Sequence, residues 1–315
     1  MIEFDEFSKP AMGGTEIIKY ELQERLPQEL LSKFQIICDR ITTLDSSKIR
    51  LFWVHNTADQ VDTRHLANRG WEKFHKIIFI SHYQKEDYQR TYGIPPSHCV
   101  VIPHGIHPVQ VQEKSKDLQL IYCSTPHRGL SLLIDVFEEI ADDYEISLRV
   151  HSSYSIYGWN EKQQEFEKSS LYARMNQHPR IQNLGFTKHD ELLKSFSQSH
   201  IFAYPCVYKE TFCLSLLEAL SSKCLAVHPD YSCLPETASN WSLMYSYHEN
   251  PIEHKKVFKN TLIRAIENYS SYETHLNKQK DYVDSFYDWN VIIPKWISFL
   301  ESIQDTKPKP RFQYY

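Results

Sequence analysis

Tyr208-Lys-Glu-Thr-Phe-Cys-Leu-Ser-Leu-Leu-Glu-Ala-Leu-Ser-Ser, residues 208–222, comes directly after the apolar run Ile201–Tyr204. The run is typical of a short buried strand, and the residues after it indicate a loop that turns into a helix. A helix N-terminus at Thr211–Phe212 would offer unpaired N–H groups and the positive end of the helix dipole, which suit a phosphate group. Strand, loop and helix in this order predict part of a parallel α/β fold.

Two glutamates in this stretch are spaced to hold one ligand. Glu210 is expected where the loop turns into the helix, and Glu218 follows eight residues later. At about 1.5 Å per helical residue this separation is roughly 12 Å, which is near the length of a diphosphate flanked by two sugars. The two carboxylates are therefore candidates for binding hydroxyls at opposite ends of such a ligand. The alternative is an amphipathic helix whose Glu218 is solvated.

Short apolar runs alternate with helical patterns along most of the chain, which predicts parallel sheets wound with helices. Strands are expected at residues 34–38, 50–54, 77–80, 99–102, 118–122, 147–150, 181–184, 201–204 and 225–228. The polar stretch 109–117 predicts a linker. We therefore expect a short first domain over residues 1–112, a second domain over 113–284, a closing helix over 285–303 and a mobile basic tail over 304–315.

Composition narrows the class of function. The chain has 315 residues and a net charge of −5, so no overall positive charge attracts nucleic acid or anionic lipid. Its seven cysteines include no Cys-x-x-Cys pair, which favours free thiols in a reduced cytoplasmic compartment. Because no apolar run approaches about 18 residues and the N-terminus is acidic, any membrane contact is expected to be peripheral.

Three further motifs stand where α/β folds bind ligands. Gly13 and Gly14 precede an amphipathic helix, and glycine lets the backbone approach a ligand closely. His55 ends the expected strand 50–54, and ligands gather at the carboxyl ends of parallel strands. Arg128 lies in the turn after the strand 118–122, and an arginine can hold phosphate oxygens bidentately. The alternatives are a merely hydrogen-bonded histidine and a surface ion pair.

Together these motifs resemble those of the retaining glycosyltransferases of family 4. The family pattern is a glutamate, seven residues, then a second glutamate followed by alanine, and Glu210, Glu218 and Ala219 match it. The chain departs from the pattern at Lys223, where the family usually has glycine, and at Cys123, where many relatives have arginine. The resemblance implies a GT-B fold, in which two Rossmann-like domains face each other across a cleft and a C-terminal helix crosses back to the first.

The resemblance also implies roles for individual residues. Glu218 would bind the ribose hydroxyls, and Glu210 would position hydroxyls of the transferred sugar. Arg128, with the helix N-terminus, would neutralise the departing diphosphate, and His55 would lie against the sugar from the first domain. The other residues that the resemblance places around the donor are Gly13, Gly14, Gly105, Gly185, Thr211, Phe212 and Cys213.

The expected activity is a retaining transfer of a sugar from a nucleoside-diphosphate sugar, with UDP or GDP favoured, to a hydroxyl of a glycan, lipid-linked or protein acceptor. No further cofactor is expected, and the absence of an Asp-x-Asp motif predicts no metal. Two alternatives stay open. One is a non-catalytic subunit that binds sugar nucleotides, and the other is a glycosyltransferase acting on nucleic acid bases. Only the basic, aromatic stretch 64–76 favours a glycosyltransferase acting on nucleic acid bases. The simpler interpretation of this stretch is a solvated helix face.

Overall fold

The computed structural model describes residues 14–41 and 43–309. The chain divides into two compact units, and each contains a parallel β-sheet with helices, which confirms the predicted α/β class. The first unit comprises residues 1–105, 210–212 and 286–315, and the second comprises 106–209 and 213–285. The division after the first unit thus falls at Gly105 instead of residue 112. The segment Glu210–Phe212 belongs to the first unit, although the residues on both sides of it belong to the second.

The first unit has a four-stranded parallel sheet in the sequential order β1-β2-β3-β4. Its strands are β1 (Phe34–Cys38), β2 (Ile49–Trp53), β3 (Lys76–Phe79) and β4 (Cys99–Val101). Its helices are α1 (Gly14–Arg25), α2 (Gln28–Leu31), α3 (His82–Tyr92), α12 (Trp289–Ile303), and the 3-10 turns η1 (Val61–Leu66), η2 (Gly70–Lys73) and η3 (Pro96–His98). On α12 the apolar residues that recur at four-residue spacing are buried: Ile292, Trp296 and Leu300.

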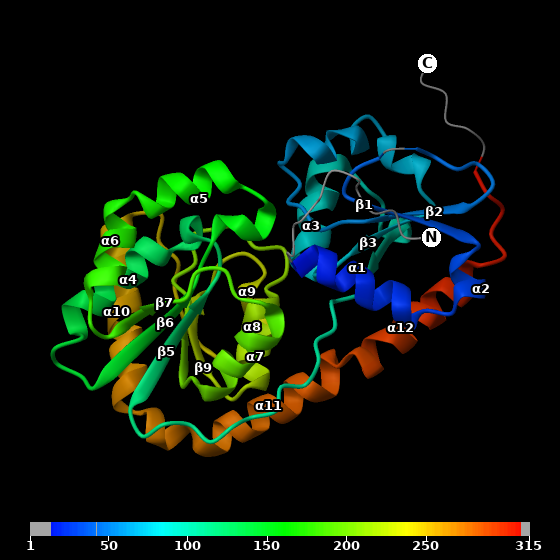
Figure 1. Ribbon diagram of the computed structural model, residues 1–315. Helices are drawn as coiled ribbons and strands as arrows, with labels where there is room; N and C mark the ends of the chain where they lie inside the picture. The colour runs from blue at the N-terminus through cyan, green and yellow to red at the C-terminus, as the bar shows by residue number, and fades with distance from the viewer. Residues whose placement is uncertain (1–13, 42, 310–315) are drawn as a thin grey trace. The chain divides into compact units, whose positions relative to one another are not determined.

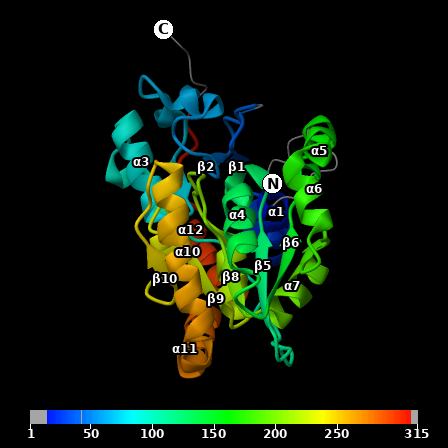
Figure 2. The same ribbon diagram turned by 90° about the vertical axis from the view of Figure 1, so that its left-hand side faces the viewer.

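The second unit has a six-stranded parallel sheet in the order β10-β9-β8-β5-β6-β7 (Figure 2). Its strands are β5 (Leu118–Cys123), β6 (Ile146–His151), β7 (Ile181–Asn183), β8 (Ile201–Ala203), β9 (Leu225–Pro229) and β10 (Leu243–Tyr245). The chain starts in the middle at β5 and moves outward to β7. It then returns to pair β8 with the free edge of β5 and continues the other way to β10. The strand order therefore reverses between β5 and β8.

Helices cover both faces of this second sheet (Figure 1). They are α4 (Leu130–Ile140), α5 (Asn160–Glu167), α6 (Ser170–Gln177), α7 (His189–Gln198), α8 (Leu214–Ser221), α9 (Leu234–Ala238), α10 (Pro251–Glu267), α11 (Glu273–Tyr287), and the 3-10 turns η4 (Pro126–Arg128), η5 (Tyr154–Tyr157) and η6 (Tyr269–Tyr272). Helix α4 packs with α6 and α10 on one face, and α8 packs with α7 and α9 on the other. Because helices cover it on both sides, β9 is buried along its whole length.

Two sequence-based expectations about the first unit are wrong. The basic, aromatic stretch 64–76 is not a solvated helix face, because Leu66, Trp71 and Phe74 belong to a buried apolar cluster under η1 and η2. Residues 310–315 of the predicted basic tail lie outside the described residues, and the part of the tail before them is anchored instead of mobile. The Lys309 ammonium donates to the carbonyl oxygens of Glu72 and Phe74 at 2.8 and 2.6 Å. In the part of the chain that is described, no helix is long and apolar enough to cross a bilayer.

Buried histidines make the stability of the second unit depend on pH. His200 accepts a hydrogen bond from the backbone N–H of Gln119 on Nδ1, at 2.9 Å, so this nitrogen must be unprotonated. Burial, with the nearby charge of Lys114, lowers the pKa of His200 to about 4. Burial likewise lowers the pKa of His151 and of His228 to about 4.

We therefore expect the protein to lose stability as the pH falls from 6.5 to 4. The pKa values of these histidines in the folded protein lie below the ordinary 6.5. The unfolded chain therefore binds more protons than the folded protein between pH 6.5 and 4. Each histidine contributes about 1–3 kcal/mol to the free energy of unfolding, and this contribution is lost on acidification. Thermal unfolding at pH 7 and pH 4.5 measures the effect. A His200→Gln variant should show a smaller drop between the two pH values than the wild type, and an equal drop would contradict the assignment to His200.

Candidate functional site

The reversal of strand order between β5 and β8 brings two turns of the second unit into contact. After β5 the chain forms η4 and reaches Gly129, whose φ of 114° lies in the region that favours glycine. A Cβ atom on Gly129 would lie 2.1 Å from the carbonyl oxygen of Pro205, which follows β8. The two turns can approach this closely only because residue 129 has no side chain. In open α/β sheets the carboxyl ends of the strands at such a reversal form the ligand-binding crevice.

Arg128 lies at this reversal point and contacts residues from two other segments. Its guanidinium carbon lies 4.2 Å from the ring centroid of Tyr208, in the turn after β8. Its Nη2 donates to the hydroxyl of Tyr157 in η5 at 3.0 Å. A ring face and a phenol hydroxyl orient the planar guanidinium, which can hold phosphate oxygens with two parallel N–H groups. The predicted arginine thus lies at the reversal of the strand order, and its role in binding phosphate stays a prediction.

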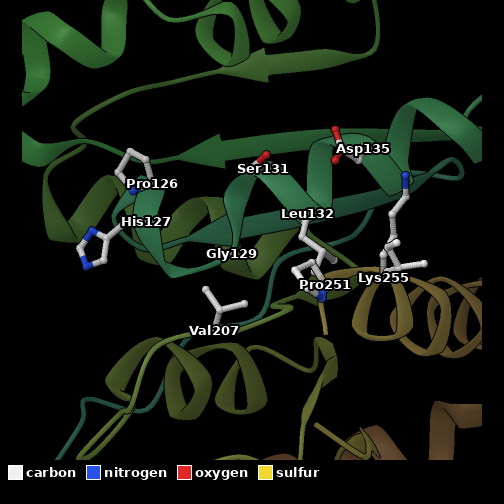
Figure 3. Close-up of a pocket in the computed structure, with 10 residues that line it drawn as sticks. Pro126, His127, Gly129, Ser131, Leu132, Asp135, Val207, Pro251 and Lys255 are labelled. Atoms are coloured by element: carbon white, nitrogen blue, oxygen red, sulfur yellow. The ribbon is translucent and has the colours of Figure 1, made fainter. Parts of the chain in front are cut away.

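A cavity of about 450 Å³ opens beside the η4 turn (Figure 3). It is lined by residues of η4, the first half of α4, the turn after β8 and the start of α10: Pro126, His127, Gly129, Ser131, Leu132, Asp135, Val207, Pro251, Ile252 and Lys255. The lining is mostly apolar and includes neither Arg128 nor Glu218. The cavity is therefore a neighbour of the predicted diphosphate site.

Glu218 is buried in the second turn of α8 and is not solvated. Its Oε1 lies 2.6 Å from Nε2 of His189, the first residue of α7. The turn before α7 contains Gly185 with φ 59°, so Glu218 is tied to a segment that the resemblance places near the donor. Cys123 lies nearby, where Ser215 donates to its Sγ at 3.6 Å. Burial raises the pKa of this thiol to about 12, so it stays neutral and does not replace the cationic arginine of relatives.

The signature stretch folds differently from its prediction. Helix α8 begins at Leu214, with the buried Cys213 as its N-cap residue, so Thr211–Phe212 is not a helix N-terminus. Because Glu210 is not on the helix, the 12 Å separation along a helix axis does not hold either. The physical reason is a long-range tether. Thr211 Oγ1 donates to the carbonyl oxygen of His55 at 2.7 Å, and Ser81 Oγ donates to the carbonyl oxygen of Thr211 at 2.7 Å.

These hydrogen bonds lie within the first unit, which contains four candidate residues of the predicted site: His55, Glu210, Thr211 and Phe212. Glu210 and His55 are both largely buried. The ring of Phe212 meets His104 edge-on at 5.1 Å, and His104 stacks on His55 at 5.3 Å with 12° between the planes. Burial, with the charge of His55 as a second cause, holds the pKa of His104 well below its usual value. Sequence reasoning therefore singled out His55, Glu210, Thr211 and Phe212, although it assigned Thr211 and Phe212 to a helix terminus.

The structure gives the local surroundings of two of the glycines that the resemblance places around the donor, and their contact with a donor stays a prediction. Gly14 is the first residue of α1. Gly13 lies outside the described residues. A Cβ on Gly105 would meet ring atoms of Trp289 at 2.5–2.9 Å, so this glycine makes room for the indole at the start of α12. Packing in the first unit therefore explains Gly105.

Sequence reasoning missed three polar residues of these clusters: Asp39, Tyr157 and His189. Asp39 directly follows β1, and its Oδ1 accepts from the backbone N–H groups of His55 and Asn56 at 2.7 and 3.3 Å. A polar residue after a parallel strand was the signal used for His55, and the same signal would have identified Asp39. Among the described residues no group of three or more His, Cys, Asp or Glu side chains is arranged to hold a metal ion.

Comparisons with known proteins identify the family. The model of the family "Glycosyl transferases group 1" matches residues 107–281, more than half of the chain. The chain therefore belongs to this glycosyltransferase family. A search of curated protein sequences found no significant match. Membership of family 4 in particular stays a prediction.

Solved structures with the same fold come from several organisms. A glycosyltransferase from Rickettsia africae ESF-5 is 12% identical, with 94% of this chain and 83% of that chain covered and a TM-score of 0.70. HepE from Anabaena in complex with UDP-glucose is 13% identical, with 87% and 81% covered and a TM-score of 0.69. Sucrose-phosphate synthase from Thermosynechococcus elongatus is 12% identical, with 91% and 78% covered and a TM-score of 0.67. These likenesses confirm the GT-B fold class.

Replacing Gly129 should test the contact between the two turns. Gly129→Ala places a methyl group against the Pro205 carbonyl and forces a residue with a side chain to adopt φ 114°, so we expect a loss of about 2–4 kcal/mol in the free energy of unfolding. Gly158→Ala is the matched control, because Gly158 has φ 71° but no atom within 4 Å of the place that a methyl group would take; it should cost only about 1–2 kcal/mol. Urea unfolding compares the variants, and equal losses would contradict a steric role for the Pro205 contact.

Proposed function

We propose that this glycosyltransferase moves a sugar from a nucleoside-diphosphate sugar, with UDP or GDP as the nucleotide, to a hydroxyl of a glycan, lipid-linked or protein acceptor, with retention of configuration. The observation that carries the proposal is the position of Arg128 at the strand reversal of the second sheet, held by Tyr208 and Tyr157. A cation there suits a diphosphate. The UDP-glucose complex of HepE and the UDP and GlcNAc complex of the pneumococcal O-GlcNAc transferase GtfA support a donor of this chemical class.

In this proposal the protein stabilises the leaving group by electrostatics. Negative charge builds up on the diphosphate as the glycosidic bond breaks, and Arg128 interacts more strongly with that charge than with the intact donor. Glu218, tied to His189, binds the ribose hydroxyls. Glu210 and His55 orient the transferred sugar, which reduces the entropic cost of reaching the transition state.

We propose that the reaction needs no metal, because the diphosphate charge is met by Arg128 and the chain has no Asp-x-Asp motif. We also propose a cytoplasmic location. The seven cysteines support it, because all are free thiols and Cys206, Cys224 and Cys233 of the second unit are completely buried, with Cys38 of the first unit nearly so. Any contact with a membrane would be peripheral.

A panel of UDP-, GDP-, ADP- and TDP-sugars tests the donor class. A donor that binds the folded protein raises its thermal midpoint by mass action, so one nucleotide series should raise it more than the others. NMR of the product, or of the slowly hydrolysed donor, should show the anomeric configuration of the donor retained, and turnover should survive EDTA. Binding without transfer or hydrolysis would instead support a non-catalytic sugar-nucleotide-binding subunit. Inversion, or activity restored only by added manganese or magnesium, would contradict the proposed mechanism.

Arg128→Ala should weaken binding of the free nucleoside diphosphate by about 1.5–3 kcal/mol, the range for a hydrogen bond to a charged group. Calorimetry with UDP or GDP measures the loss. The matched control is Arg180→Ala, which removes an arginine of the same unit that pairs with Asp142 and the carbonyl oxygen of Tyr144. An Arg128→Ala protein that binds the diphosphate as tightly as the Arg180→Ala control would exclude Arg128 from the donor site.

A further inference from the structure

The imidazole of His55 in the first unit is buried, and neither of its ring nitrogens makes a hydrogen bond of good geometry to the described residues. The side chain of His55 is only 6% exposed, and its Nε2 has no hydrogen-bond partner among the described residues. Leaving a buried polar atom unpaired is costly, so each such atom in a native protein calls for an explanation, and a functional role is one of them. Its neighbours in the cluster are ring faces: His104 stacks on one side, and Trp53 lies 4.6 Å away between ring centroids.

The other nitrogen of the ring faces a carboxylate. Nδ1 of His55 lies 3.3 Å from Oδ2 of Asp39. The second carboxylate oxygen, Oδ1, accepts from the backbone N–H groups of His55 and Asn56, which fixes the carboxylate relative to the ring. Asp39 also has φ 58°, an uncommon conformation for a residue with a side chain. Such backbone strain persists only where the surrounding structure holds it, and it occurs most often at functional sites.

The charges around this pair keep Asp39 ionised. Burial alone would raise the pKa of the Asp39 carboxyl, but the charge of His55, hydrogen bonds to His55 and the charge of Lys19 on α1 together bring it below its usual value. The phenol of Tyr88 on α3 faces the same carboxylate, and the charge of Asp39 contributes, after burial, to raising the pKa of Tyr88. Both the Tyr88 phenol and the His104 imidazole therefore stay neutral, which leaves the Lys19 ammonium and the Nδ1 side of the His55 ring to face Asp39.

We propose that Asp39 is a positioning residue for His55: its carboxylate holds the neutral imidazole as the tautomer protonated on Nδ1 and aims the lone pair of Nε2 at a hydroxyl of the transferred sugar. The assignment rests on the proposed donor class, and it adds a specificity rule. An imidazole nitrogen that carries a lone pair can accept a hydrogen bond from a hydroxyl but cannot donate one. Donors that lack this hydroxyl leave Nε2 buried and unpaired, so they should be used poorly.

The tautomer can be measured in the free protein, without any donor. In the ¹⁵N spectrum of protein labelled at histidine, the resonances of His55 are identified by their loss in a His55→Gln variant. We expect Nδ1 to be protonated and Nε2 unprotonated in the neutral ring. In Asp39→Asn, Oδ1 keeps the two backbone N–H groups and the amide NH₂ faces Nδ1, so the proton should move to Nε2. The proposal is wrong if the wild-type ring carries its proton on Nε2, and this result does not depend on how Asp39→Asn folds.

Kinetics then separate positioning from structure. Asp39→Asn should lower turnover about 10- to 100-fold, the usual cost of losing a partner that orients a functional histidine. Its affinity for UDP or GDP should be unchanged, because the proposed diphosphate residues belong to the second unit. The matched control is Asp45→Asn, whose carboxylate accepts from the N–H and hydroxyl of Ser47 in the same unit and should leave the tautomer and turnover unaltered.

The outcomes distinguish this assignment from the proposed function. An Asp39→Asn protein with wild-type turnover and tautomer would overturn the role of Asp39. If the wild type turns over no sugar nucleotide at all, the proposed function fails, whereas the measured tautomer still decides whether Asp39 sets the state of His55.

Discussion

The close approach of two backbone turns in the second unit is the constraint on which the donor side depends. Gly129 after β5 and Pro205 after β8 come together where the strand order reverses, and no residue with a side chain fits between them. This contact fixes the start of α4 and the turn that carries Tyr208. Arg128 directly precedes Gly129, so the same backbone contact positions its guanidinium against the Tyr208 ring. The geometry of the cation is thus set by the backbone before any ligand arrives.

The donor side also carries less positive charge than the resemblance implies. Where many relatives are expected to have two basic residues, this chain has a half-buried thiol at Cys123 and one guanidinium at Arg128. The thiol stays protonated at neutral pH, so the local positive charge is smaller by one. Aromatic groups surround the remaining cation, and His127 stacks on Tyr154 beside it with 6° between the rings. A low-dielectric surrounding strengthens each remaining electrostatic contact, which offsets part of the missing charge.

Local sequence patterns were enough to predict the sheets, but not the signature loop. Apolar runs located nine of the strands to within a residue or two, and several of these strands, such as β1, β2 and β9, are buried on both faces. Strand β10, which is only three residues long, was missed. The start of α8 was misplaced because Thr211 is held by His55, 156 residues away along the chain. No local propensity reports such a contact, and Asp39 was missed because a polar residue after a strand also suits an ordinary turn.

The composition of the first unit also bears on the order of events during synthesis. Its sheet is made from residues before Gly105, but α12 supplies Trp296, whose ring packs edge-on against Trp53 at 5.1 Å between centroids. Lys309 adds hydrogen bonds under η2. A ribosome makes these segments about 190 residues or more after the last strand of the sheet, at roughly 5–20 residues per second. The first sheet must therefore wait on the order of ten seconds or more with the Trp53 side chain uncovered. The second unit, from which residues 210–212 are excluded, is complete once residue 285 has been made. This protein thus finishes its second domain before its first.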